Sequence, residues 1–158
     1  MSSAVTLVEL RRGTTADLPT VDSIMREAFD PRYGEAWTRG QCLGIMAMPG
    51  VWLTMASIDG VSVGFALSRL LVDEVELLLL ATRPARRRCG IGRALVASVI
   101  DTAREQHASR VHLEVRSGND AIKLYAATGF HKVGERRDYY RGANGQLFDA
   151  MTFSRQIA

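Results

Sequence analysis

The most restrictive feature of this sequence is the segment 75–93, which passes from an apolar run through a cluster of arginines to Gly90-Ile91-Gly92. Residues 77–81 are wholly apolar, which is typical of a strand buried on both faces. Pro84 predicts a turn after this strand, and the residues that follow Gly92 carry apolar side chains at helical spacing. A strand, a loop and a helix in this order predict an α/β domain.

The loop in this segment has the composition of an anion site. Glycines let main-chain N–H groups approach a ligand closely, and a helix N-terminus leaves about four such donors unpaired and carries roughly half a positive charge. Arginine guanidinium groups bind phosphate oxygens in pairs, so a diphosphate suits the loop better than a carboxylate. We expect the ligand to contact Arg87, Arg88, Cys89, Gly90, Ile91, Gly92 and Arg93.

Two common phosphate-binding motifs fit this loop poorly. The Walker loop requires lysine and then serine or threonine after its last glycine, whereas Arg93 and Ala94 follow Gly92 here. The dinucleotide fingerprint requires a third glycine where Leu95 stands, and it makes a tighter turn than this arginine-rich loop allows. A nucleoside triphosphatase and a dinucleotide-binding domain are therefore both disfavoured.

The composition is that of a globular protein, with 47% hydrophobic and 23% charged residues in a chain of 158. This length predicts a single domain over residues 1–158, and we expect a monomer or weak dimer. No apolar run is long enough to span a bilayer, and the first residues do not resemble a signal peptide, so we expect a cytoplasmic protein that binds no membrane. Cys42 and Cys89 are expected to be free thiols.

The net charge of +3 is modest, and the arginines gather in two short stretches rather than along one face. The first arginine cluster contains no aromatic residues, which argues against nucleic-acid binding. His107, His112 and His131 share no spacing typical of metal ligands, so we expect no metal site.

Local patterns predict most of the remaining secondary structure. A first strand is expected at 5–10, a helix from 18 to 29, and a second helix after the capping box Thr38-x-x-Gln41. Asp59-Gly60 predicts a hairpin between strands 51–58 and 61–71, followed by a central strand at 75–82. A helix from Gly90 or Ile91, a parallel strand at 111–115, a helix at 121–128 and strands at 130–140 and 148–156 complete the chain.

Glu114 is the strongest candidate for a catalytic base. The two-residue period of a strand places Val111, Leu113 and Val115 on one face and Glu114 on the other. The carboxylate then lies near the carboxyl end of a strand that neighbours the phosphate loop, where open α/β sheets bind ligands. The alternative for Glu114 is a solvated surface glutamate.

Several motifs together resemble those of one enzyme family. Arg87-x-x-Gly90-x-Gly92 resembles the [QR]-x-x-G-x-[GA] signature of the GNAT acyltransferases, in which main-chain amides hold the pyrophosphate of acetyl-coenzyme A. Residues 113–116, 119, 121–125, 129–130, 137–140 and 149–150 resemble the ribosomal-protein alanine N-acetyltransferase (RimI) branch. The resemblance implies a mixed, mostly antiparallel sheet of about seven strands flanked by about four helices, with two central parallel strands splayed into an acetyl-coenzyme A cleft.

The same resemblance assigns roles within the cleft. Main-chain amides of Leu80, Ala81 and Thr82 would hold the pantetheine arm and polarise the thioester carbonyl. Glu114 would remove the proton of the amine, and Tyr125 would protonate the leaving thiolate. Glu76, at the start of the strand 75–82, is the second choice for the base, because some acyltransferases of the wider family take it from this strand. Asn119 would contact the coenzyme, but the spacing from Asn119 to Ala121 is one residue shorter here than is usual in the family, whereas Tyr125 keeps its spacing.

The acceptor is predicted from pKa values and from the resemblance. An α-amine titrates near ~7.7 to 8 and a lysine near ~10.4, a gap of roughly 2.5 pKa units. Forming the neutral amine at pH 7 therefore costs about 3.5 kcal/mol more for a lysine than for an α-amine. The resemblance implies an N-terminal alanine, as in a small-subunit ribosomal protein. A small amine, such as an amino acid or polyamine, and a non-enzymatic coenzyme A-binding regulator are the alternatives.

Two groups of residues are candidates for contact with the acceptor. Tyr33 and Trp37 follow the first helix, where the resembled fold walls the acceptor groove, although packing at the edge of the core explains such aromatics equally well. The second group either frames an acceptor peptide or forms a solvated edge, and it comprises Arg136, Arg137, Tyr139, Tyr140 and Arg141.

Overall fold

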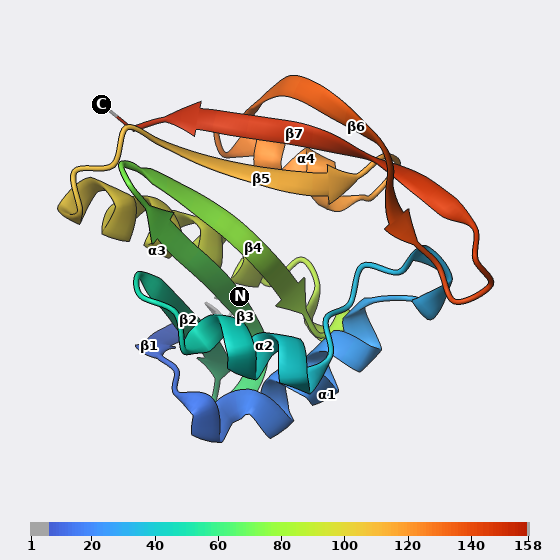
Figure 1. The fold of residues 1–158 in the computed structure, drawn as a ribbon. Helices are drawn as coiled ribbons and strands as arrows, with labels where there is room; N and C mark the ends of the chain where they lie inside the picture. The colour runs from blue at the N-terminus through green and yellow to red at the C-terminus, as the bar shows by residue number, and fades with distance from the viewer. Residues whose placement is uncertain (1–6, 158) are drawn as a thin grey trace, which may run out of the picture.

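A computed structural model describes residues 7–157 and shows one seven-stranded sheet with helices on both faces (Figure 1). The strand order is β1-β2-β3-β4-β5-β7-β6. Within the described residues, β4 and β5 pair in parallel and the other neighbouring strands pair antiparallel. The predicted mixed sheet, its flanking helices and the central position of β4 are confirmed.

The first half of the chain builds one side of the molecule. The elements are β1 (Glu9–Arg12), α1 (Leu18–Ala28), α2 (Arg39–Met46), β2 (Val51–Ile58) and β3 (Val61–Leu71), with short 3-10 helices at Thr15–Asp17 and Pro31–Tyr33. The hairpin predicted at Asp59-Gly60 is confirmed, and both residues have positive φ angles. The first strand begins later than predicted, at Glu9; residues 5 and 6 lie outside the described part of the chain.

The second half contains β4 (Glu74–Thr82), a 3-10 helix (Pro84–Arg86), α3 (Ile91–Glu105), β5 (Arg110–Arg116), α4 (Ala121–Ala127), β6 (His131–Arg141) and β7 (Leu147–Gln156). The ends that were predicted for these elements differ from the observed ones by at most one residue. The chain leaves β5 through α4, forms β6 at the edge of the sheet, and returns as β7 between β5 and β6.

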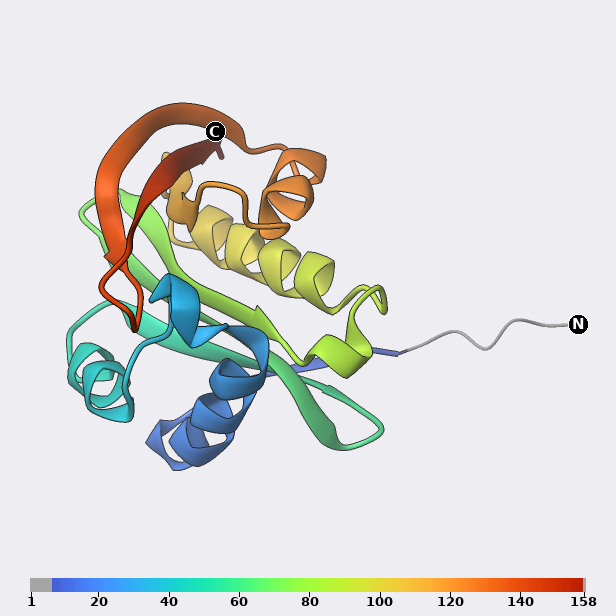
Figure 2. The same cartoon turned by 90° about the vertical axis from the view of Figure 1, so that its right-hand side faces the viewer.

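The sheet separates two apolar clusters. One lies against α3 and α4 and includes Val75 and Leu77, and the other lies against α1 and α2 and includes Leu79 and Ala81. Figure 2 shows α3 beside one face of the sheet and α1 with α2 on the other side. The apolar run in β4 therefore contributes to both clusters, as the lack of alternation predicted.

A β-bulge lets β4 place buried side chains in both apolar clusters. Leu67 of β3 pairs with Leu79, and Ser68 pairs with Leu77, so Leu78 has no partner in this ladder. An extra residue of this kind bends the strand, increases its twist and leaves a backbone group unpaired. The bulge lies in the part of β4 that approaches the phosphate loop.

The capping box predicted at the start of α2 is confirmed. The Thr38 hydroxyl accepts a hydrogen bond from the Gln41 amide at 3.1 Å, and the Gln41 side chain accepts one from the Thr38 amide at 2.8 Å. We expect Thr38→Ala to lower the free energy of unfolding by about 1 kcal/mol, because the Gln41 amide at the helix start loses its hydrogen bond to the Thr38 hydroxyl. Urea denaturation measures this loss of stability. Thr102→Ala, inside α3, is the control. Equal losses in the two variants would contradict a specific effect of the cap.

Candidate active site

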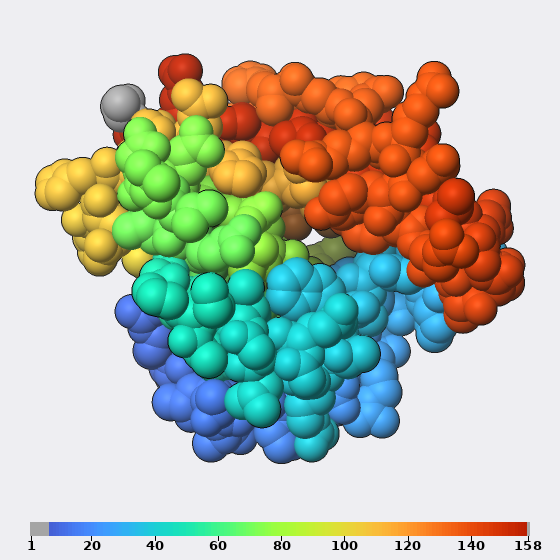
Figure 3. Space-filling model, viewed as in Figure 1, coloured from blue at the N-terminus to red at the C-terminus, as the bar shows by residue number. Residues whose placement is uncertain are grey.

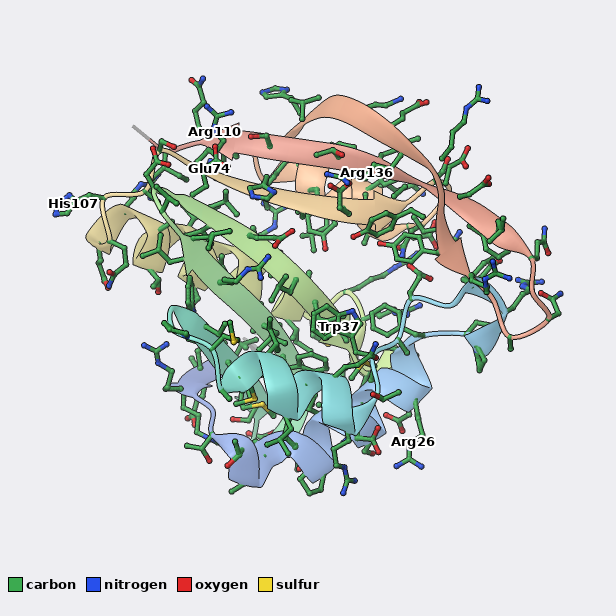
Figure 4. The ribbon with its side chains drawn as sticks, viewed as in Figure 1. Arg26, Trp37, Glu74, His107, Arg110 and Arg136 are labelled. Atoms are coloured by element: carbon green, nitrogen blue, oxygen red, sulfur yellow. The ribbon has the colours of Figure 1, made fainter. Side chains whose placement is uncertain are left out.

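The two parallel strands separate soon after they meet. They pair at Glu74 with Arg110, Val75 with Val111 and Glu76 with His112, and no further pairing follows. An ion pair of 3.2 Å between Glu74 and Arg110 lies at the joined end (Figure 4). Beyond it the strands diverge, and Figure 3 shows a hollow between the orange β6–β7 half and the blue-to-green half of the molecule.

The backbone before α3 leaves the start of this helix open. Gly90 has a φ of 79° and occupies the N-cap without any side-chain cap, and a Cβ atom at this position would meet nothing within 4 Å. Arg88 also has a positive φ, of 67°. The first amides of α3 therefore have no intrahelical partner, and the space beside Gly90 is open, which is the geometry that favours an anion.

Charged side chains surround this opening. Within the described residues, Arg86, Arg87, Arg88 and Arg93 are exposed and form no ion pair in the structure. Arg83 differs, because it donates to the Ser62 carbonyl at 2.9 Å and pairs with Glu27, which ties the loop to β3 and α1. The four exposed arginines give the opening a positive potential.

Gly92 has a packing role that the sequence did not reveal. A Cβ atom there would lie 2.9 Å from Cδ2 of Leu124 in α4, so the glycine lets the two helices approach. Half-buried Cys89 precedes Gly90 in the same loop. The residues predicted to bind phosphate thus lie together, and one of them also positions α4.

Glu114 lies where the strands have separated, on the face of β5 opposite α3. Its side chain is 10% exposed, and one carboxylate oxygen accepts a hydrogen bond from the Thr152 hydroxyl at 2.6 Å. The other oxygen forms an ion pair of 3.0 Å with Nε of Arg136 in β6. Sequence reasoning predicted the outward direction of Glu114 but neither of these partners.

Tyr125 in α4 is buried, with its ring edge-on to Phe130 at 5.8 Å between centroids. Burial raises the pKa of the Tyr125 hydroxyl above its usual range, and the negative charge of Glu35 adds to this effect. The hydroxyl therefore keeps its proton at neutral pH and can donate it or a hydrogen bond.

A second bulge brings two more tyrosines over Glu114. In β6, Arg136 pairs with Ala150 and Tyr140 with Phe148, so residues 137–139 lie opposite Asp149 alone. The Tyr140 hydroxyl donates to the main-chain oxygen of Glu114 at 3.3 Å, and its ring meets that of Tyr139 edge-on at 4.8 Å. Burial raises the pKa of both tyrosines, and the charge of Glu114 contributes in each case.

Sequence reasoning missed a buried ionic cluster beside the cleft. Glu35, in the segment between α1 and α2, is 8% exposed and pairs with Nε of Arg116 at 3.0 Å. Its second oxygen accepts from the Asn119 side chain at 2.7 Å, and the Asn119 oxygen accepts from the Ala121 amide at 2.8 Å. Both polar atoms of Asn119, predicted to contact the coenzyme, are thus engaged within the protein.

The two aromatic candidates for acceptor contact both have packing roles. The Tyr33 ring lies under the Arg116 guanidinium at 3.7 Å and edge-on to Phe148 at 5.1 Å. Trp37 is half-buried against the apolar cluster that lies against α1 and α2, and Figure 4 shows it below the region where β4 and β5 separate. The segment that carries them is therefore packed against both β5 and the β6–β7 hairpin.

Glu76, the second candidate base, is held at the joined end of the strands. It lies in the last residue pair before β4 and β5 separate, and it forms an ion pair of 2.6 Å with Nη2 of Arg69.

Residues 7–157 contain no cluster of three or more His, Cys, Asp or Glu side chains suited to a metal ion. Nor does this part of the chain contain a helix long and apolar enough to cross a membrane.

The sheet order, the bulged fourth strand and the cleft between splayed parallel strands define an acyltransferase fold. The crystal structure of the ribosomal-protein-S18-alanine N-acetyltransferase from Escherichia coli superimposes with a TM-score of 0.83 at 28% identity, covering 96% of this chain and 95% of that chain. The sequence model of the Acetyltransferase (GNAT) family matches residues 18–130. The chain therefore belongs to the GNAT family, and the resemblance found in its motifs is confirmed.

Two curated relatives of this chain are N-acetyltransferases. The [ribosomal protein bS18]-alanine N-acetyltransferase of Escherichia coli K12 is 36% identical over 89 residues, which are 56% of this chain and 60% of that protein. The N-alpha-acetyltransferase RimI of Mycobacterium tuberculosis is 38% identical over 108 residues, which are 65% of this chain and 66% of that protein. The sequence matches thus span about two thirds or less of the length of these relatives.

Proposed function

We propose that this protein transfers an acetyl group from acetyl-coenzyme A to the α-amine at the N-terminus of a protein. The observation that carries the proposal is the separation of β4 and β5 after Glu76 and His112. It opens a passage between the arginine-rich loop before α3 and the carboxylate of Glu114 on the opposite face of the sheet. A thioester entering from the first side can meet an amine entering from the second.

The loop before α3 has the properties of a diphosphate site. The uncapped helix start and the open space at Gly90 leave room for phosphate oxygens close to the main-chain amides. Arg87, Arg88 and Arg93 supply charge around it, with Cys89, Ile91 and Gly92 contributing backbone. Asn119 is not included, because Glu35 and the start of α4 already engage its side chain.

The edge of β4 that faces the cleft suits the pantetheine arm. Leu80, Ala81 and Thr82 pair with β3 on one side, and β5 has already turned away on the other. Backbone groups that point into the cleft therefore have no strand partner, and the bulge at Leu78 adds to them. Such amides can bind the arm and polarise the thioester carbonyl.

The reaction proceeds by direct transfer. The amine nitrogen bonds to the thioester carbonyl carbon, and the carbon–sulfur bond breaks. Glu114 takes the proton that the amine loses, and Tyr125 gives its proton to the departing sulfur. Exchange with solvent then restores both side chains, so no enzyme nucleophile is needed.

Two arguments favour a protein N-terminus as the acceptor. An α-amine is about half deprotonated near pH 8, whereas a lysine is almost entirely protonated there and would require far stronger help from a single carboxylate. The relatives named above are an alanine N-acetyltransferase of ribosomal protein bS18 and an N-alpha-acetyltransferase. A small-subunit ribosomal protein that begins with alanine is therefore the acceptor we propose.

The role of the arginine loop can be measured directly. We expect Arg88→Gln to weaken coenzyme binding by about tenfold, because a charge-assisted hydrogen bond contributes roughly 1.5 kcal/mol or more. Isothermal titration calorimetry with acetyl-coenzyme A gives the affinity. Arg12→Gln, an exposed change in β1, is the control, and an equal loss in both variants would assign the effect to net charge alone.

The choice of acceptor is tested by competition. Release of free thiol from acetyl-coenzyme A is followed with a peptide that begins with alanine, with free amino acids and with a polyamine. The proposal predicts that the peptide has the highest kcat/KM. A higher value for a free amine would replace it with a small-molecule acetyltransferase, and no thiol release with any acceptor would favour a coenzyme-binding regulator.

A further inference from the structure

Arg136 blocks the side of Glu114 that an acceptor would use. One oxygen of Glu114 is fixed by the Thr152 hydroxyl at 2.6 Å, so the oxygen paired with Arg136 is the one left to receive a proton. The guanidinium Nε lies 3.0 Å from it. The guanidinium therefore lies at the oxygen that is left for an amine and competes with the amine for it.

The contacts that hold Arg136 are few. It lies on the edge strand β6, immediately before residues 137–139 leave the regular ladder, and its side chain is 62% exposed. Apart from Glu114, its guanidinium faces the ring of Tyr139 at 5.9 Å. Arg136 is the exposed partner of this ion pair, so its guanidinium can turn into solvent, where it is well hydrated. The Glu114 carboxylate is nearly buried, so it needs another cation or hydrogen-bond donor in that place.

Arg136 resembles the acceptor amine that would replace it beside Glu114. The acceptor arrives as an ammonium or as a neutral amine, and both forms donate hydrogen bonds to a carboxylate, as a guanidinium does. Figure 4 shows Arg136 next to β5, close to the region where β4 and β5 separate. The side chain is a cationic group held at the oxygen that the substrate nitrogen needs.

We propose that Arg136 is a placeholder cation, which occupies the Glu114 oxygen until the acceptor α-amine displaces it. This inference rests on the proposed function, with Glu114 as the base. Arg136 is then a positioning residue that keeps the carboxylate charged and correctly turned in the free enzyme. It competes with the acceptor but takes no part in the transfer step.

A placeholder predicts an unusual kinetic result. Arg136→Gln removes the internal competitor, so the KM for an alanine-starting peptide should fall by about fivefold, the order of magnitude expected for an ion pair whose cationic partner is exposed. The kcat and the KM for acetyl-coenzyme A should remain within about twofold, because the transfer step and the phosphate loop are unchanged. Arg136→Lys, which restores a cation, should return the peptide KM toward the wild-type value.

A matched variant separates the loss of this ion pair from a general loss of positive charge on β6. Lys132→Gln removes another exposed cation from β6 that pairs with Glu135 rather than with Glu114, and its peptide KM should not change. A higher or unchanged peptide KM in Arg136→Gln overturns the placeholder, and so does an equal fall in Lys132→Gln. If the wild-type enzyme acetylates no peptide, the proposed function itself fails; if it does and the variant shows no fall, only the placeholder fails.

Discussion

Replacing Tyr125 with phenylalanine is expected to slow acetyl transfer by about 10²- to 10³-fold, the usual contribution of a positioned proton donor. The ring and its packing against Phe130 remain, so coenzyme binding and folding should be preserved. Initial rates of thiol release measure the loss, and calorimetry with acetyl-coenzyme A measures the binding. Equal turnover by Tyr125→Phe would remove this residue from the mechanism.

Tyr140→Phe is the matched comparison for this variant. Burial raises the pKa of Tyr140 as it does that of Tyr125, but the Tyr140 hydroxyl is already engaged with the main-chain oxygen of Glu114. We expect its loss to reduce the rate by less than about tenfold, in line with one neutral hydrogen bond. A larger loss in Tyr140→Phe than in Tyr125→Phe would identify Tyr140, and not Tyr125, as the proton donor.

The raised pKa of Tyr125 also shapes the pH dependence of the reaction. A proton donor must be protonated, and burial keeps Tyr125 protonated beyond the point near pH ~10 at which an ordinary tyrosine ionises. The kcat/KM for the peptide should rise as the α-amine loses its proton near pH ~8 and then stay level through pH ~10. A fall of kcat/KM below pH ~9.5 would contradict this assignment.

Replacing Glu114 with glutamine should lower kcat by about 10²- to 10³-fold, because the amine then has no carboxylate to take its proton. The amide can still accept from the Thr152 hydroxyl, so the local structure is retained. A further sign is the pH profile, in which the loss should shrink as rising pH deprotonates the amine without help. An undiminished rate would exclude Glu114 as the base.

Glu76→Gln tests the other candidate base under the same conditions. Glu76 lies at the joined end of the strands and is tied to Arg69, so the space for an amine begins beyond it. We expect Glu76→Gln to lose less than about tenfold in kcat, with any effect arising from the lost ion pair. The reverse order of the two losses would move the base to Glu76.

The sequence predicted the fold well where the signals are local. The Asp59-Gly60 hairpin, the Thr38 capping box and the start of α3 after Gly90 depend on a few adjacent residues, and all three are confirmed. The position of β7 between β5 and β6 depends on pairing between distant segments. No local pattern encodes that order.

The site was predictable in part for the same reason. The period of two in β5 gave the direction of Glu114, and the glycine spacing gave the open start of α3. The bulges at Leu78 and at residues 137–139 have no signature in the sequence, because they arise from the register of neighbouring strands. The partners that depend on those bulges, such as Arg136, could not be foreseen.

The buried cluster around Glu35 had no sequence signal at all. Glu35 and Arg116 are far apart along the chain, and a glutamate in a loop is usually exposed. Asn119 fits into this cluster beside the shortened connection to α4, so a role transferred by resemblance was the least secure of the site predictions. Roles transferred by resemblance depend on spacing as much as on residue type.

If the cleft delivers an acetyl group to an α-amine, a peptide that begins with alanine and contains an internal lysine should be acetylated at one position only. Mass spectrometry after incubation of this peptide with the protein and acetyl-coenzyme A measures the modification. We expect one added acetyl group, located by fragmentation on the N-terminal alanine. An acetyl group on the lysine, or an unmodified peptide, would show that the cleft does not transfer acetyl to an α-amine.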